Sequence, residues 1–153
     1  MNRADEAATF SLPVVAVENS APVLTARAAR TRNALIRAAR SLFESQGYLD
    51  TNVNDIAKLA RVAHGTFYTY FSSKEEIFQE VAKALNAEFM ELASAEPPLP
   101  EGAGLRARIE RGNRGYLRAY ERYAPMIAVL EQVATFNPRL AEIRRGSRSE
   151  EHT

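Results

Sequence analysis

Residues 51–71, TNVNDIAKLARVAHGTFYTYF, predict two short helices and the turn between them. Asn52 is placed to cap the first helix, and Asp55 adds a carboxylate to the positive first turn of that helix. Ile56, Leu59 and Ala60 have the spacing of a buried face, which limits this helix to about two turns. A turn over residues 61–63 follows.

The second helix is predicted over residues 64–71, HGTFYTYF. Phe67 and Phe71 lie four residues apart, so both rings fall on one face of the helix, and we expect that face to be buried. The remaining side chains, which include Thr66, Thr69 and Tyr70, point elsewhere. Two short helices joined by a tight turn and preceded by a longer helix form a helix-turn-helix unit.

The second helix of such a unit can lie in the major groove of DNA, with its first residues nearest the base edges. Threonine offers a hydroxyl or a methyl group to bases, and tyrosine hydroxyls reach phosphate oxygens. The alternative reading is a plain aromatic mini-core without a ligand.

The distribution of charge favours the DNA-binding reading. Residues 25–74 contain eight basic and three acidic residues and so have a net charge of +5, although the whole chain of 153 residues has a net charge of only +1. Such a segregated basic segment is typical of a nucleic-acid-binding domain attached to a nearly neutral body. The other reading of the same charges is a solvated helix face.

The composition argues against other classes of protein. There is no cysteine, and the two histidines, His64 and His152, lie far apart, so we expect no metal site and no cofactor. An enzyme is not expected either, because no nucleophile lies beside a base and Glu75 and Glu76 fit the acidic first turn of a helix. The apolar run near the N-terminus is interrupted by Pro13, so we expect neither a signal peptide nor a membrane span. We therefore expect a cytoplasmic protein associated with the nucleoid.

Hydrophobic periodicity predicts longer helices on both sides of this unit. The first covers residues 25–46, with Gly47 as its C-terminal cap. The next starts after Ser73, which pairs with Glu76 as a capping box, and runs to about residue 95, before a proline-rich loop. Further helices are predicted over residues 105–123, over residues 126–135 after Pro125, and after Pro138. One side of the 105–123 helix gathers Leu105, Ile109, Tyr116, Tyr120 and Tyr123.

The run TRNALIRAARSLFESQGYLDTNVNDIAKLARVAHGTFYTYFSSKEEIF, residues 31–78, resembles the N-terminal domain of the TetR family of bacterial transcriptional repressors. The resemblance implies an all-α fold. A three-helix DNA-binding domain over residues 25–72 would precede a shortened helical ligand-binding and dimerisation domain over residues 73–145, between disordered ends at residues 1–24 and 146–153. It also implies that a small-molecule effector releases double-stranded DNA and that the protein forms a homodimer. The alternative is a shortened relative that binds DNA weakly or acts by heterodimerising with a full-length protein.

The resemblance also implies which residues contact the ligands. The DNA-binding positions are Asn54, His64, Gly65, Thr66, Tyr68, Thr69, Tyr70 and Lys74. Lys74 lies in the first turn of a helix, where a cation is unfavourable unless an outside anion such as a phosphate lies nearby. The simpler reading of Lys74 is an ordinary exposed lysine. The candidates for an effector pocket are Phe89, Tyr116, Tyr120, Met126, Ile127 and Leu130, and the same spacing is also that of an ordinary helical core. No polar group among them identifies the effector.

Two positions depart from the family pattern. Arg61 stands where the turn usually has glycine, so it must either adopt a left-handed conformation at a cost of about 1 kcal/mol or change the turn. Ala63 stands where a serine or threonine usually caps the second short helix, and such a cap contributes about 1 kcal/mol. In the helix over residues 105–123, Gly112 and Gly115 leave room either for a ligand or for close helix packing.

Overall fold

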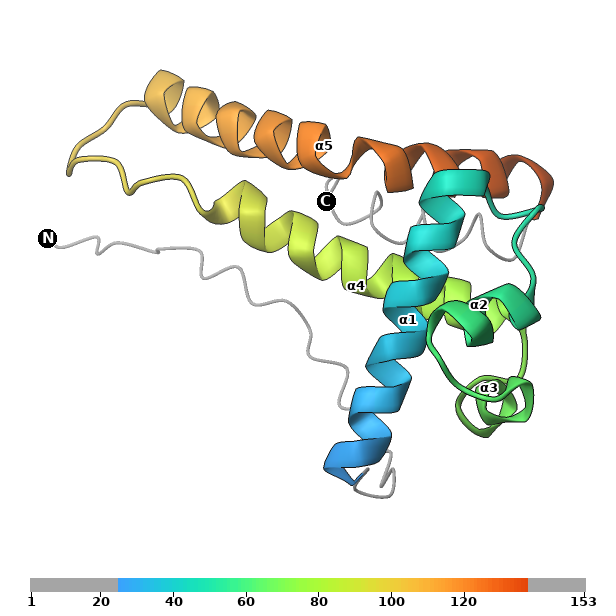
Figure 1. Cartoon of the computed structure of the whole chain (residues 1–153). Coiled ribbons are helices and arrows are strands. Elements are labelled where there is room, and N and C mark those ends of the chain that lie inside the picture. Colours follow the sequence, from blue (N-terminus) through green and yellow to red (C-terminus); the bar gives the residue numbers. More distant parts are fainter. Residues whose placement is uncertain (1–24, 138–153) are drawn as a thin grey trace, which may run out of the picture.

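The computed structural model describes residues 25–137, which form five helices and no strand (Figure 1). They are α1 (Ala26–Gln46), α2 (Val53–Leu59), α3 (His64–Tyr70), α4 (Lys74–Ser94) and α5 (Leu105–Phe136). The all-α prediction is confirmed for this part of the chain. The expectations for residues 1–24 and 146–153, and for a helix after Pro138, lie outside the described residues.

The helix ends are set by the capping residues that the sequence suggested. The Asn52 side chain accepts a hydrogen bond of 2.9 Å from the Asp55 amide at the start of α2. Ser73 does the same for the Glu76 amide at 3.1 Å. The Glu76 carboxylate, however, accepts from the amide of Ser72 at 2.6 Å, one residue earlier than in a standard capping box. Gly47 ends α1 with a φ of +84°, a conformation that favours glycine.

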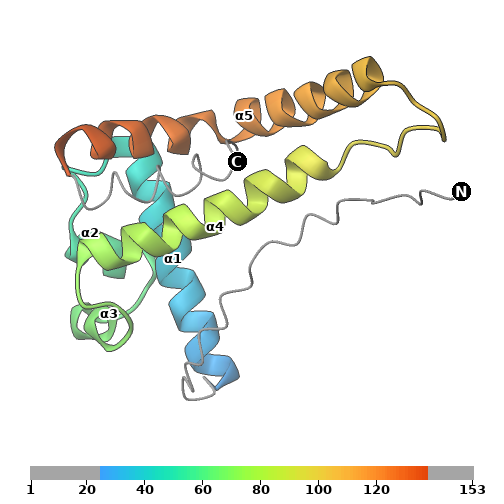
Figure 2. The same ribbon diagram turned by 180° about the vertical axis from the view of Figure 1, so that it is seen from behind.

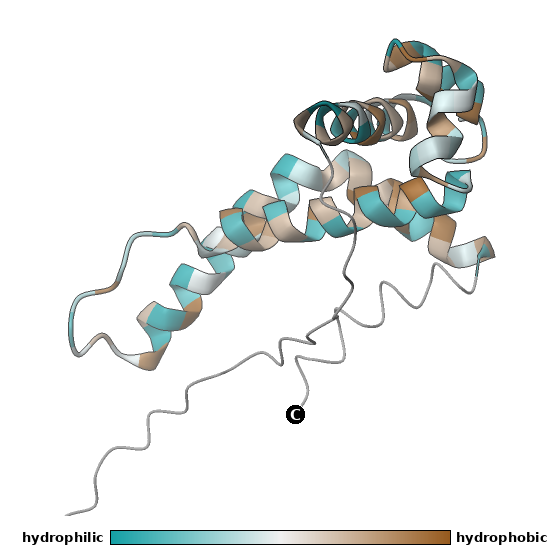
Figure 3. Ribbon diagram, turned by 90° about the horizontal axis from the view of Figure 1, so that it is seen from below, coloured by the Kyte–Doolittle hydropathy of each residue, from teal (hydrophilic) through white to brown (hydrophobic). Residues whose placement is uncertain are grey.

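Four phenylalanine rings lie in the buried core that the first four helices share. Phe67 and Phe71, the predicted inward pair, are 0% and 1% exposed. Phe43 of α1 meets Phe78 of α4 edge-on, with 5.2 Å between the ring centroids. Each buried ring removes a large apolar area from water, and such burial is the main favourable contribution to folding. Hydrophobic and hydrophilic residues alternate around the helices, as amphipathic packing requires (Figure 3).

Helices α4 and α5 run side by side, and α1 crosses them (Figures 1 and 2). Two ion pairs connect α1 to α4: Arg32 to Glu80 at 2.7 Å and Arg40 to Glu88 at 2.8 Å. Both partners move forward by eight residues between the first pair and the second, so the two pairs hold the helices in one register. Burial disfavours the charged form of Glu80, but Lys83 and Arg32 outweigh this effect and lower the pKa of its carboxyl below the ordinary value.

A lowered pKa in the folded protein makes the Glu80 ion pair a source of acid sensitivity. Its contribution to stability is present above the ordinary carboxyl pKa and is lost as the pH falls through the lowered folded pKa. We expect Glu80→Gln to reduce the free energy of unfolding at pH 7 by about 1 kcal/mol and to reduce the loss of stability between about pH 5 and 3. Urea unfolding at several pH values measures both effects. A parallel downward shift of the whole pH profile would contradict this assignment.

The predicted break at Pro125 is wrong, because α5 is one helix from Leu105 to Phe136 with this proline inside it. Figure 1 shows an irregularity in the ribbon midway along α5. A proline within a helix removes one hydrogen bond and costs about 3 kcal/mol. The next turns bury Met126, Val129 and Val133 in the core, and this packing stabilises the helix beyond the proline.

In the first half of α5, the buried side is not the side that carries the large apolar residues. Gly115 and Ala119 are buried against α4, whereas Tyr116 is 53% and Tyr120 is 42% exposed. A Cβ atom built on Gly115 would lie 1.9 Å from the carbonyl oxygen of Ala93, so the helices touch here through their backbones. Close helix packing, one of the two roles considered for this glycine, is therefore the observed one.

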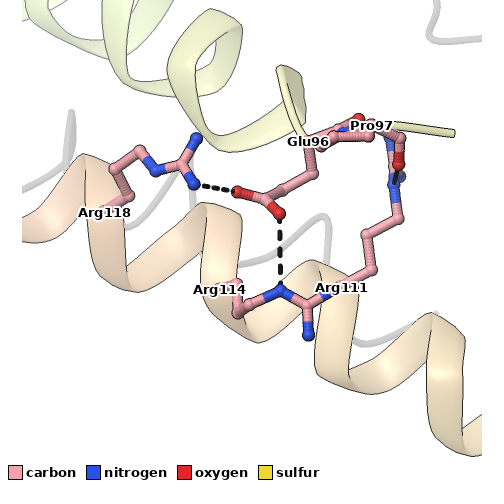
Figure 4. Close-up of polar contacts among 5 residues, drawn as sticks. All are labelled: Glu96, Pro97, Arg111, Arg114 and Arg118. Carbon is pink, nitrogen blue, oxygen red and sulfur yellow. Dashed lines mark hydrogen bonds and ion pairs between the residues drawn. The ribbon is translucent and has the colours of Figure 1, made fainter.

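The connection after α4 is fastened to α5 by arginines (Figure 4). The Glu96 carboxylate, whose side chain is only 4% exposed, lies 2.8 Å from the Arg118 guanidinium and 3.4 Å from that of Arg114. The Arg111 guanidinium donates hydrogen bonds to the backbone carbonyls of Glu96 and Pro97. These contacts fix the far end of α4, whose near end begins beside α3.

Candidate nucleic-acid interface

The turn between α2 and α3 is closed by backbone hydrogen bonds although it lacks glycine. Arg61 adopts a φ of +58°, the left-handed conformation that the sequence offered as one of two outcomes. Its amide donates to the Lys58 carbonyl at 3.1 Å, and the Val62 amide donates to the Ala57 carbonyl at 3.0 Å. The strain of about 1 kcal/mol is therefore tolerated within a hydrogen-bonded turn.

The helix α3 begins without a side-chain cap. Ala63 occupies the N-cap position in an extended conformation and makes no side-chain hydrogen bond, as the missing serine or threonine implied. Phe67, 0% exposed, holds α3 against the core from the inside, and the following Phe71 does the same at its end. The helix is thus positioned by its aromatic inner face rather than by its cap.

The outer face of α3 presents most of the predicted DNA-binding residues to solvent. His64, Gly65, Tyr68 and Thr69 are exposed, and Thr66 and Tyr70 are half-buried at the sides of the helix, as is typical of positions between two faces. The rings of His64 and Tyr68 meet edge-on, with 5.5 Å between their centroids. Asn54, the one predicted residue on α2, is also exposed.

Gly65 is not required by the fold itself. A Cβ atom at this position would meet nothing within 4 Å, and its φ is not in the left-handed region. The surface beside α3 is therefore open at Gly65, which lets an external backbone come close to the helix.

Lys74 is placed differently from the other predicted residues, because its ammonium group already has partners inside the protein. It donates to the backbone carbonyls of Tyr48 and Thr51, both at 2.8 Å, and lies 4.3 Å from the centroid of the Tyr48 ring. Burial lowers the pKa of Lys74, and the carboxylates of Glu75 and Asp50 oppose this shift. The first-turn cation is thus satisfied internally, so Lys74 does not require an outside anion.

The six residues considered for an effector pocket divide into two groups. Met126 is fully buried in the core, and Ile127 and Leu130 pack against that core. Phe89 is half-buried and meets the ring of Tyr116 edge-on at 5.2 Å, and Tyr116 in turn stacks on Tyr120 at 6.4 Å. The second group is a partly exposed aromatic cluster on the α4 and α5 surface, so the effector site stays a prediction.

Sequence reasoning missed a groove between the start of α1 and α3. Its volume is about 390 Å³. It is lined by Thr25, Arg27, Ala28, Thr31, Val62, Ala63, Thr66 and Tyr70. Arg27 and Thr31 are four residues apart, and this spacing already placed them on one side of α1. That this side faces α3 depends on how helices distant in sequence cross.

Two structural findings concern other kinds of site. Within residues 25–137, no three histidine, aspartate or glutamate side chains are grouped closely enough to hold a metal ion. Over the same range, no helix combines the length and the apolar character that crossing a bilayer requires.

The two short helices, the turn at Arg61 and the exposed face of α3 define a helix-turn-helix domain. The family model for "Bacterial regulatory proteins, tetR family" matches residues 35–81. These residues are therefore a TetR-family N-terminal domain, and the resemblance seen in the sequence is confirmed.

Individual relatives agree with this assignment. The chain is 36% identical over 127 residues to the transcriptional regulator TcmR of Streptomyces glaucescens, covering 80% of this chain and 55% of TcmR. It is 35% identical over 63 residues to the transcriptional repressor KstR2 of Mycolicibacterium smegmatis, covering 41% of this chain and 31% of KstR2. The solved structure of the flavonoid-responsive regulator FrrA superposes with a TM-score of 0.59 at 32% identity, covering 76% of this chain and 59% of FrrA. The chain thus spans less than two thirds of each of these proteins.

Proposed function

We propose that this protein is a sequence-specific DNA-binding transcriptional regulator that places α3 in the major groove of its operator. The observation that supports this most strongly is the division of α3 into two faces. Phe67 is fully buried, whereas His64, Tyr68 and Thr69 on the same two turns are exposed. A recognition helix needs this arrangement, because its inner face must fix the position of the side chains that meet the DNA.

The exposed residues have the chemistry for both kinds of DNA contact. We assign Thr66 and Thr69 to base edges, where a hydroxyl or methyl group discriminates between base pairs. Tyr68, Tyr70 and His64 are assigned to phosphate oxygens, which set the register of the protein on the duplex. The open surface at Gly65 allows the DNA backbone to come close, and Asn54 extends the contact surface onto α2. Lys74 has two of its three N–H donors occupied, so at most one remains for a phosphate.

The proposed regulator is a repressor that a small molecule releases from DNA. Support for this comes from its family, which includes the repressor KstR2 and the flavonoid-responsive FrrA. Helix-turn-helix proteins usually read two half-sites with two domains, so the proposal includes a dimer, either with a second copy or with a relative. The exposed aromatic cluster of Phe89, Tyr116 and Tyr120 is the candidate surface for the effector.

Substitutions on α3 test the assignment of base and phosphate contacts. We expect Thr66→Ala to reduce discrimination between the operator and a single-base variant by about 1–3 kcal/mol, because one base contact is lost. Tyr68→Ala should weaken binding to both duplexes by similar factors, because a phosphate contact is lost. Fluorescence anisotropy on both duplexes measures these changes.

The matched control is Leu117→Ala on α5. Leu117 is 59% exposed and Tyr68 is 52% exposed, so each substitution removes a similarly accessible large side chain. The control should bind both duplexes as the wild type does. Identical behaviour of Thr66→Ala and Tyr68→Ala would refute the division into base and phosphate contacts.

A further inference from the structure

The groove between α1 and α3 combines a cation with hydroxyl groups and continues the proposed DNA-binding surface. Arg27 and Thr25 line it from α1 and its cap, and Thr66 and Tyr70 line it from α3. The last two residues belong to the face already assigned to DNA. The groove therefore opens where a duplex bound to α3 would pass the start of α1.

Arg27 lacks the kind of structural partner that two other arginines of α1 have. Arg32 and Arg40 each pair with a glutamate of α4, at 2.7 and 2.8 Å. Arg27 is exposed, and its guanidinium makes no hydrogen bond or ion pair with any residue of the described range 25–137. The first turn of α1 also contains no acidic residue that would balance its charge.

The position of Arg27 also makes an internal role unfavourable. A cation in the first turn of a helix is repelled by the positive end of the helix dipole. Lys74 also lies in the first turn of its helix, α4, and there two backbone carbonyls and the Tyr48 ring stabilise it. Arg27 has no such compensation among the described residues, so an anion from outside the protein is the partner that its surroundings favour.

The hydroxyls of the groove complete a donor set for an oxyanion. The Tyr70 side chain makes no hydrogen bond within the described range, and the Thr25 oxygen accepts from the Ala28 amide and keeps its own proton to donate. Thr31 is less free, since it donates to the Arg27 carbonyl at 3.2 Å. A guanidinium beside hydroxyl donors suits the two free oxygens of a phosphodiester.

We propose that this groove binds one backbone phosphate of the DNA, with Arg27 as its cation. The inference rests on the proposed function and adds a contact from α1 to those made by α3. In this arrangement α1 contacts the DNA backbone while α3 lies in the major groove of the same duplex. Arg27 is therefore a positioning residue that fixes how α3 enters the major groove.

The test is a salt series of anisotropy titrations with Arg27→Ala, on the operator and on a scrambled duplex. For each subunit bound to the duplex, we expect binding to both duplexes to weaken by about tenfold, as for the loss of one charged hydrogen bond. The slope of log affinity against log salt should fall by about 0.9 for each bound subunit, the value for one phosphate contact. Arg27→Lys should retain the slope and part of the affinity, because it keeps the charge but not the fork of donors.

Arg37→Ala is the matched control. Arg37 is also exposed on α1 and unpaired within the described range, but it lies ten residues further on, about 15 Å along the helix axis. We expect it to bind with the slope of the wild type. Melting temperatures of all variants should be close to that of the wild type, since neither side chain has a structural partner, with Arg27→Ala slightly higher because it removes a cation from the positive end of α1.

Three outcomes would overturn the inference. If the wild type binds DNA and Arg27→Ala has the same slope of log affinity against log salt, the inference is refuted and the proposed function stands. A wild-type protein that binds no duplex would refute both. If inorganic phosphate alone raises the melting temperature of the wild type but not of Arg27→Ala, while the DNA slope is unchanged, the groove binds a free anion instead.

Discussion

Phe67→Ala should lower the free energy of unfolding by about 3–5 kcal/mol, the usual cost of removing a buried phenylalanine ring. Phe67 is 0% exposed, and its ring lies 5.7 Å from that of Phe71 and 5.3 Å from that of Tyr68, measured between centroids. A single domain is stable by only about 5–15 kcal/mol, so this one substitution removes a large share. Urea unfolding followed by circular dichroism measures the loss.

The same substitution should abolish DNA binding, because α3 has no side-chain cap and depends on its inner face for position. Tyr68→Ala is the control for stability: it removes a ring next in sequence that is 52% exposed, and its free energy of unfolding should stay within about 0.5 kcal/mol of the wild type. A loss below about 1 kcal/mol for Phe67→Ala would mean that the inner face of α3 does not hold the helix.

Gly115→Ala should lower the free energy of unfolding by about 2–3 kcal/mol, an effect expected of overpacking in a close contact. The added Cβ would lie 1.9 Å from the Ala93 carbonyl oxygen and 3.2 Å from Cγ of Glu96. Backbone atoms cannot rotate away as a flexible side chain does, so α4 and α5 must separate. The Glu96 carboxylate would then also be displaced from Arg114 and Arg118 (Figure 4).

Gly112→Ala provides an exact chemical match on the same helix with the opposite expected sign. A Cβ at Gly112 meets nothing within 4 Å, so alanine should stabilise α5 by about 0.5–1 kcal/mol through its better helix propensity. Thermal and urea unfolding of both variants give the comparison. If both substitutions stabilise the protein, α4 and α5 are further apart than the described contact requires.

The DNA-binding half of the fold was predictable because its local signals agree with one another. Asn52 caps α2, Gly47 ends α1, and the four-residue spacing of Phe67 and Phe71 marks the inner face of α3. Each of these features depends on residues close in sequence, and tertiary packing reinforces each of them. The left-handed conformation of Arg61 was one of the two outcomes that its position in the turn left open.

The α4 and α5 half was less predictable because its packing uses small residues. The large apolar side chains Leu105 and Ile109 suggested the inner side of the helix, but they are 73% and 53% exposed. Gly115 and Ala119 face α4 instead, since their size lets the backbones approach. Pro125 was read as a helix start because the core contacts that keep α5 continuous come from distant parts of the chain.

The candidate site shows the same division. The exposure of Tyr68 and Thr69 followed from the helical spacing around Phe67. The carbonyl partners of Lys74 and the groove beside Arg27 did not, because both arise where segments distant in sequence meet. Periodicity assigns a residue to a face of its own helix but not to the neighbour which that face meets.

If α3 reads a specific DNA sequence, selection from a pool of randomised duplexes should enrich that sequence. The selected duplex and a scrambled version are then compared by anisotropy at one salt concentration. We predict an enriched sequence that the protein prefers by about a thousandfold or more, which is the range of specific regulators. A pool without enrichment, bound equally well in every sequence, would contradict the claim.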